Sequence, residues 1–218
     1  MWIKICGIRD VATAAAVAAE GVQALGLNFY AGSSRHVDLP TAEAIVAQLP
    51  STVEPVGLFV NHPVDEVLKI AARCRLRTIQ LHGDETPETV SRLREFRIIR
   101  AFRVDEAGLG DMAAYLARCR SLDATPWACL VDAKVAGQYG GTGQRAPWEL
   151  LHQQYRREDW PPLILAGGLL PENVATAIQA VRPWGVDVAG GVESSMACKD
   201  LARVRKFVEQ ARLIPDGA

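Results

Sequence analysis

Short apolar runs alternate with helix-like segments from one end of the chain to the other. Each run is three to eight residues long and is rich in Val, Ile, Leu or aromatic residues, which is typical of buried strands. The predicted strands cover residues 2–6, 22–29, 55–60, 78–81, 98–102, 127–131, 163–165 and 186–188.

Helix signals fill the segments between these runs. In the segment DVATAAAVAAEG, Asp10 is placed to cap a helix and Gly21 to end it. Further predicted helices cover residues 41–49, 64–74, 86–96, 171–181 and 199–213. The last one has an apolar stripe made of Leu201, Val204, Val208 and Leu213, which we expect to be buried.

Strands that alternate with helices predict an α/β fold with a parallel sheet. Eight strand–helix units of about 27 residues each match the repeat count of a closed (β/α)₈ TIM barrel, and an open doubly wound sheet is the competing architecture. No low-complexity linker divides the chain, so we expect residues 1–218 to form a single domain.

Charge and cysteine content narrow the function classes. With 24 Lys and Arg against 25 Asp and Glu, the net charge is −1, so we expect no nucleic-acid partner bound through a basic surface. The five cysteines are scattered without a CxxC pair, which fits reduced thiols in the cytoplasm. The N-terminal segment lacks a signal-peptide core, and no apolar run approaches the roughly 20 residues that span a bilayer, so we expect no membrane insertion.

Polar residues stand at the ends of the predicted strands, where a parallel barrel carries its active site. Strand alternation places Lys4 and Cys6 in the barrel interior, with Ile3 and Ile5 facing the helices. A free cysteine is most often a small buried hydrophobe. However, Cys6 precedes a glycine and lies two residues from a cation that could favour its thiolate.

Asp132 closes an apolar run, where an unpaired carboxylate would be costly to bury. A helix cap or a salt-bridged surface acid explains it equally well from the pattern alone. A thiolate at Cys6 and a carboxylic acid at Asp132, facing each other across a barrel mouth, could withdraw and donate protons. This combination suits isomerisation of a sugar carbonyl.

Glycine clusters also follow strand ends, where backbone N–H groups can approach an anion closely. Phosphate sites after strands 7 and 8 are frequent in barrels, although turn geometry explains any single cluster as well. The clusters comprise Gly140, Gly141, Gly143, Gly167, Gly168, Gly190 and Gly191. Neither a P-loop nor a GxGxxG dinucleotide motif is present.

The histidines are isolated, without HxH or HExxH spacing, so we expect no metal. His82 lies at a strand end, where a structural role is more common than an orienting one. Arg35 lies in the loop AGSSRHV and could bind a carboxylate or phosphate bidentately, although most loop arginines are only solvated.

Taken together, an ordered set of motifs resembles the phosphoribosylanthranilate isomerase family over residues 3 to about 200. The motifs are KICGIRD, GLNFYAGSSRHV, PVGLFVN, IQLHGDE, VDAKVAGQYGGTGQ, LAGGLLPENV and GVDVAGGVE. The resemblance implies a (β/α)₈ barrel that performs the Amadori rearrangement of N-(5-phosphoribosyl)anthranilate, a small phosphosugar, in tryptophan biosynthesis. It also implies that no cofactor is needed.

The resemblance implies roles for individual residues. Cys6 would be the general base at the ribose C2 carbon, and Asp132 the general acid at the furanose ring oxygen. Arg35 would lie near the anthranilate carboxylate, with Asp187 and His82 contacting substrate at the same mouth. The phosphate would lie on backbone at Gly141, Gly143, Gly167, Gly168, Gly190 and Gly191.

Three departures from the family pattern bear on affinity. Ala189-Gly190 stands where a serine pair is usual, which removes hydroxyl contacts to phosphate. Ser33-Ser34 replaces a serine–proline pair, which we expect to leave the Arg35 loop less rigid. Lys134 would make Asp132 harder to protonate if the two pair.

Two alternatives of different classes stay open at this point. One is another phosphosugar enzyme, either an epimerase, which should show paired metal histidines, or an isomerase of histidine synthesis, which should use aspartates at both catalytic strand ends. The other is a catalytically silent barrel that acts as a binding module. The sequence also leaves a monomer and a homodimer equally open.

Overall fold

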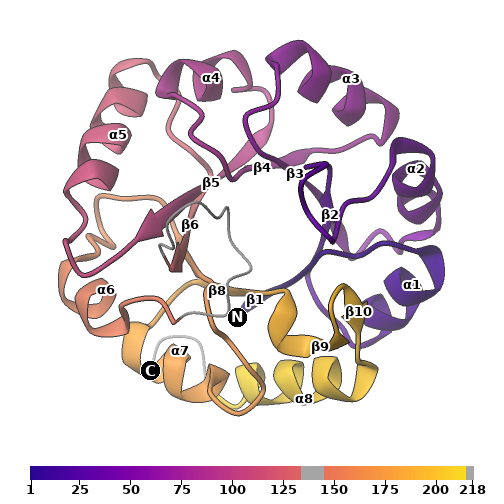
Figure 1. Ribbon diagram of the computed structural model, residues 1–218. Coiled ribbons are helices and arrows are strands. Elements are labelled where there is room, and N and C mark those ends of the chain that lie inside the picture. Colours follow the sequence, from indigo (N-terminus) through magenta and orange to yellow (C-terminus); the bar gives the residue numbers. More distant parts are fainter. Residues whose placement is uncertain (134–144, 215–218) are drawn as a thin grey trace.

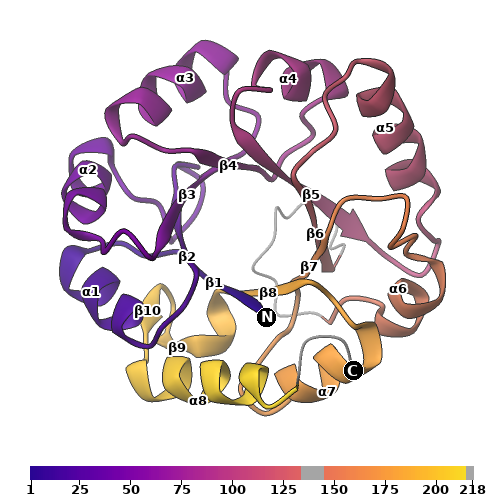
Figure 2. The same ribbon diagram turned by 180° about the vertical axis from the view of Figure 1, so that it is seen from behind.

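The computed structural model describes residues 1–133 and 145–214. Its core is a closed parallel barrel in which the strands follow one another in sequence order and β8 pairs with β1 (Figures 1 and 2). The barrel strands are β1 (Trp2–Cys6), β2 (Ala24–Asn28), β3 (Glu54–Phe59), β4 (Thr78–Leu81), β5 (Arg97–Val104), β6 (Ala128–Ala133), β7 (Leu163–Leu165) and β8 (Gly185–Val188). The predicted (β/α)₈ fold is therefore confirmed, and the open sheet is excluded.

Helices form a ring outside the barrel. They are α1 (Val11–Ala19), α2 (Leu39–Gln48), α3 (Val64–Arg73), α4 (Pro87–Arg92), α5 (Gly110–Ser121), α6 (Trp148–Gln154), α7 (Val174–Val181) and α8 (Leu201–Arg212). The carboxylate of Asp10 accepts from the Thr13 amide at 2.8 Å, so α1 is capped as predicted. Gly21, at φ +79°, follows the end of that helix.

The predicted stripe of α8 is wrong at both ends. Leu201 is 41% exposed and Leu213 is 65% exposed. Leu201 is the first residue of the helix, and Leu213 lies five positions beyond Val208, which turns it away from the barrel. The buried residues of α8 follow the i, i+3, i+4, i+7 spacing instead and are Val204, Phe207, Val208 and Ala211.

Strand alternation separates two apolar layers. Ile3 and Ile5 belong to the large core between the barrel and the helices, as predicted. A smaller cluster that includes Val56, Ile99 and Leu130 fills the barrel interior. Both clusters are buried, so the strand ends are held on a packed scaffold.

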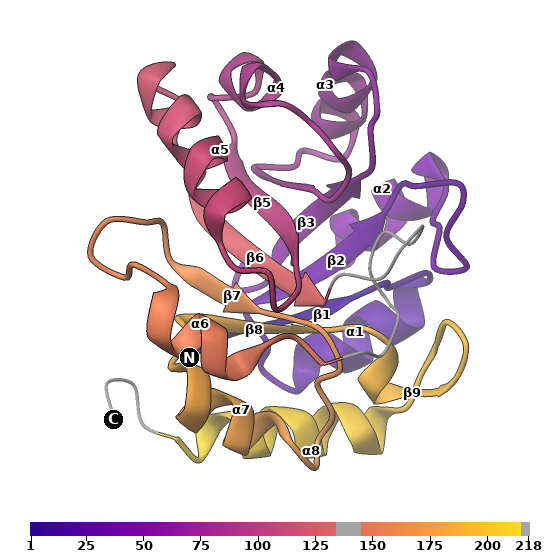
Figure 3. The ribbon, with the colours of Figure 1, turned by 60° about the vertical axis from the view of Figure 1, so that its left-hand side comes forward.

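The connection after β8 departs from a simple strand–helix repeat. It contains a 3₁₀ turn, η1 (Gly190–Val192), and an antiparallel hairpin of β9 (Glu193–Ser195) and β10 (Cys198–Lys199). In Figure 3 β9 projects on the side toward which the arrow of β6 points. The hairpin therefore belongs to the face formed by the carboxyl ends of the strands. None of the helices in residues 1–133 and 145–214 is both long and apolar enough to cross a membrane.

Candidate active site

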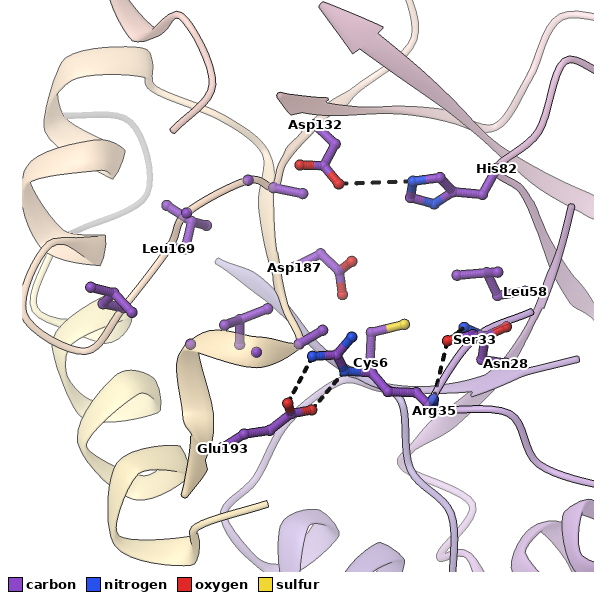
Figure 4. Close-up of a pocket in the computed structure, with 18 of the residues that line it drawn as sticks. Cys6, Asn28, Ser33, Arg35, Leu58, His82, Asp132, Leu169, Asp187 and Glu193 are labelled. Atoms are coloured by element: carbon purple, nitrogen blue, oxygen red, sulfur yellow. Dashed lines mark hydrogen bonds and ion pairs between the residues drawn. The ribbon is translucent and has the colours of Figure 1, made fainter. Parts of the chain in front are cut away.

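A cavity of about 500 Å³ opens where the barrel strands end (Figure 4). Every predicted site residue in the described part of the chain lines it. These residues are Cys6, Arg35, His82, Asp132, Asp187, Gly167, Gly168, Gly190 and Gly191. Gly140, Gly141, Gly143 and Lys134 lie outside the described residues.

A buried ion pair forms one wall of this site. Lys4 has no solvent exposure, and its Nζ lies 2.9 Å from Asp187 Oδ1. The pair follows from the barrel register, in which Lys4 is opposite Asp187 across β1 and β8. Burial alone would lower the pKa of Lys4, but Asp187 and Cys6 outweigh it, so the pKa of Lys4 is raised. Lys4 is therefore a fixed cation.

The thiol of Cys6 lies beside this cation. A Cβ atom on Gly26 would lie 2.6 Å from Cys6 Sγ and 3.0 Å from Lys4 Nζ, so a glycine of β2 leaves room for both groups. Burial raises the pKa of Cys6, and the opposing effect of Lys4 does not cancel it. The expectation that Lys4 favours the thiolate is right in direction, but the resting thiol is protonated at neutral pH.

Asp132 and His82 face each other across the upper part of Figure 4. His82 Nε2 lies 3.8 Å from Asp132 Oδ2, and Asp132 Oδ1 accepts from the Ala133 amide at 2.8 Å. The amide of Gln80 donates to His82 Nδ1 at 2.8 Å, which leaves the ring proton on Nε2, toward the acid. Burial, reinforced by Lys4 and two arginines, lowers the pKa of His82 to about 3. The imidazole is therefore neutral at physiological pH.

Arg35 reaches the cavity from the loop after β2. Its Nε donates to Glu193 Oε1 and its Nη2 to Glu193 Oε2, both at 2.7 Å. Ser33 Oγ accepts from the Arg35 amide at 3.1 Å and from Asn28 Nδ2 at 3.0 Å, so this serine ties the loop to β2.

Sequence reasoning missed Glu193. The residue stands at the end of the motif GVDVAGGVE and is only 8% exposed. Its position two residues after Gly191, in a segment that follows a barrel strand, was the available signal.

The two glycine loops are in contact. Gly167 and Gly168 have φ values of +82° and +61°, which favour glycine. A Cβ atom on Gly191 would lie 1.8 Å from the carbonyl oxygen of Leu169, so only glycine fits there. Both loops line the cavity through these glycines, together with Leu169, Leu170 and Ala189. Within residues 1–133 and 145–214, no group of three or more His, Cys, Asp or Glu side chains is arranged to hold a metal ion.

The fold and the site define a (β/α)₈-barrel enzyme with ionisable side chains around a cavity at the carboxyl ends of its strands. Residues 3–210 match the family model of N-(5'-phosphoribosyl)anthranilate isomerase. The chain is 43% identical over 211 residues to N-(5'-phosphoribosyl)anthranilate isomerase of Geobacter metallireducens, covering 96% of this chain and 98% of that protein. It is 44% identical over 214 residues to the isomerase of Pseudomonas aeruginosa, covering 96% and 94%.

Solved structures agree with these relatives. The phosphoribosylanthranilate isomerase of Thermotoga maritima superposes with a TM-score of 0.85 at 33% identity, over 98% of this chain and all of the other. A phosphoribosylanthranilate isomerase in complex with reduced 1-(o-carboxyphenylamino)-1-deoxyribulose 5-phosphate gives 0.82 at 32% identity, again over 98% and 100%. The chain belongs to the N-(5'-phosphoribosyl)anthranilate isomerase family, which confirms the resemblance and the expectation of an isomerase.

Proposed function

We propose that this chain converts N-(5'-phosphoribosyl)anthranilate to 1-(o-carboxyphenylamino)-1-deoxyribulose 5-phosphate by an Amadori rearrangement, in tryptophan biosynthesis. The observation that carries the proposal is that Cys6 and Asp132 line one cavity, from β1 and β6. Its volume of about 500 Å³ suits a small phosphorylated ligand.

Asp132 acts first, as general acid. It protonates the furanose ring oxygen, and the C1–O bond breaks to give an open-chain Schiff base. The neutral imidazole of His82 lies 3.8 Å from the carboxyl group of Asp132 and adds no positive charge beside it. Both groups are largely buried and line the cavity that the substrate would fill.

Cys6 acts second, as general base. Its thiolate removes the proton from C2, which gives an enolamine. A proton is then returned to C1 while the C2 hydroxyl loses its proton, which yields the ketose and restores the thiolate and the carboxylic acid. The base works from a minor thiolate fraction, because burial raises the pKa of Cys6. Lys4 stabilises that thiolate and holds Asp187 in place. Acid and base must be separate groups, since one proton is delivered to oxygen while another is withdrawn from carbon.

Two anionic groups of the substrate anchor it in the cavity. The phosphate lies on the backbone of Gly167, Gly168, Gly190 and Gly191, where glycines permit close approach. The anthranilate carboxylate meets Arg35, whose guanidinium has donors beyond the two that Glu193 uses. This double anchorage places C2 near Cys6.

The test is turnover of phosphoribosylanthranilate, followed by loss of its fluorescence. We expect Cys6→Ala and Asp132→Asn each to lower kcat by at least about 10²-fold. Cys198→Ala removes an exposed thiol and Asp159→Asn an exposed carboxylate, so both should keep wild-type turnover. Inactive wild-type protein, or full activity in both site variants, would refute the proposal.

A further inference from the structure

We infer that Glu193 is a positioning residue that, together with Lys199, holds Arg35 in the orientation that receives the carboxylate of the substrate's aromatic ring. The inference rests on the proposed function and adds to it a determinant of substrate specificity. Neither Glu193 nor Lys199 has a part in the proton transfers.

The first support is the geometry of the Arg35–Glu193 pair. Two parallel hydrogen bonds of 2.7 Å engage Nε and Nη2 of the guanidinium. An arginine has five N–H donors, so three are left, two on Nη1 and one on Nη2. In Figure 4 the guanidinium lies on the cavity side of Glu193, next to Cys6. Because the guanidinium group is planar and Glu193 holds its Nε and Nη2, the remaining N–H donors point in one fixed direction.

The second support is the space cleared for the Arg35 side chain. A Cβ atom on Gly7 would lie 2.6 Å from Arg35 Cδ, and one on Gly190 would lie 3.2 Å from Arg35 Nη2. The arginine therefore crosses the chain directly after Cys6 and passes the glycine turn after β8. Its backbone amide is held by Ser33 Oγ at 3.1 Å. The side chain is thus fixed at both of its ends.

The third support is how Glu193 itself is held. Lys199 Nζ donates to Glu193 Oε1 at 2.8 Å and to the Ala189 carbonyl at 2.9 Å, and the Ala197 amide donates to Oε2 at 3.1 Å. All three contacts involve the β8–α8 connection and its hairpin. Burial raises the pKa of Glu193, but the hydrogen bonds and charges of Arg35 and Lys199 outweigh it and lower the pKa to about 2, so Glu193 remains a carboxylate at neutral pH.

The charges of Arg35, Glu193 and Lys199 leave a net positive charge at the cavity. Arg35 and Lys199 carry two positive charges and Glu193 one negative charge, so the cluster retains one positive charge. The side chain of Lys199 is 1% exposed and that of Arg35 is 16% exposed. The buried lysine balances the glutamate, and the charge of the arginine stays available to an anion at the cavity. A glutamate without this lysine would cancel the arginine.

The experiment compares Glu193→Gln with wild type on two substrates: phosphoribosylanthranilate and the phosphoribosylaniline analogue that lacks the carboxylate. For the anthranilate we expect KM to rise at least about tenfold and kcat to change less than about threefold, because binding geometry is lost and the acid and base are untouched. For the aniline analogue we expect both parameters to change less than about twofold.

Two further variants separate positioning from a general effect on the fold. In an Arg35→Lys background, Glu193→Gln should add less than about twofold to KM, because the fork that it holds is already gone. Glu172→Gln, which breaks an exposed 2.9 Å pair with Lys206, is the matched control and should change nothing. Thermal unfolding of each variant records stability separately.

Three results would overturn the inference: an unchanged KM in folded Glu193→Gln, an equal KM effect on both substrates, or an undiminished effect in the Arg35→Lys background. If Glu193→Gln does not fold, Lys199→Met takes its place in the experiment. We expect the same rise in KM for the anthranilate and not for the aniline analogue, and an unchanged KM for the anthranilate would overturn the inference. Inactive wild-type protein would instead refute the proposed function, so the two failures are distinguishable.

Discussion

Replacing Asp187 with Asn removes the charge that balances Lys4 in the barrel interior. Lys4 has no solvent exposure and its ammonium lies 2.9 Å from the carboxylate, so water cannot take over the role of Asp187. Removing one member of a buried pair costs about 3–5 kcal/mol. Since the amide still offers an oxygen to the ammonium, we expect a loss near the lower limit, about 3 kcal/mol. That is a large share of the stability of an ordinary domain.

The loss should depend on pH with a defined sign. Without Asp187, burial drives the pKa of Lys4 below its unfolded value, because desolvation is the largest influence on this group. The folded variant then binds fewer protons than the unfolded chain. The difference in unfolding free energy between wild type and Asp187→Asn should therefore be largest at low pH. It should shrink as pH rises toward about 10, the unfolded pKa of lysine.

Urea unfolding of wild type and Asp187→Asn at pH 6 and pH 9 measures both effects. A double-mutant cycle with Lys4→Met and Asp187→Leu completes the test. We expect the double variant to be more stable than either single variant, since an apolar pair leaves no charge unbalanced. A loss below about 1 kcal/mol at both pH values, or purely additive single effects, would show that the pair does not govern stability here.

Four other outcomes are expected. Because burial raises the pKa of the Cys6 thiol, kcat/KM should still climb as pH increases toward 9, and a plateau from pH 7 would contradict this. The pKa of His82 is about 3 in the folded protein, so below pH 6.5 the unfolded chain binds a proton there that the folded protein does not. The free energy of unfolding should therefore fall by up to roughly 5 kcal/mol by pH 3. His82→Asn should flatten that decline in urea unfolding, and an unchanged slope would speak against burial of the neutral ring. Gly191→Ala should lower stability by about 1–3 kcal/mol and raise KM, because its Cβ would overlap the Leu169 carbonyl oxygen, whereas wild-type values would disprove that overlap. A thiol reagent should reach Cys198 and the cavity-lining Cys6 in native protein, and Cys74, Cys119 and Cys129 only after denaturation. Reaction of any of these three in native protein would contradict their burial.

The alternation of apolar runs with helix signals predicted eight strand–helix units, but by itself it left an open doubly wound sheet as the competing architecture. Barrel strands such as β1 bury both faces over most of their length and read as apolar runs, and caps such as Asp10 mark where helices begin. Two helices, α5 and α6, were not predicted. Neither has a side-chain cap, and α6 has only seven residues. The short α6 depends on its tertiary contacts, whereas α5 has twelve residues and buries Met112, Leu116 and Cys119 at helical spacing, a signal that sequence reasoning missed.

Some residues of the candidate site could be predicted from the sequence and others could not. Cys6, Asp132 and Asp187 could be found because strand order alone brings strand ends together in a barrel. Glu193 could not, because its partner Arg35 is 158 residues away and its position depends on the hairpin of β9 and β10. That hairpin turns at Ala197, with φ +62°, a conformation that alanine rarely adopts and that composition does not reveal.

The charged groups that frame the cavity are paired before any substrate arrives. Lys4 is fixed by Asp187 and Arg35 by Glu193, each at hydrogen-bonding distance. A site assembled in this way has little to reorganise when charge moves during proton transfer, which is the condition under which fixed dipoles and ions act most strongly. The same pairing implies that a change in a partner residue affects catalysis through displacement of its cation. The effect should therefore diminish once that cation is itself replaced, whichever of the two pairs is tested.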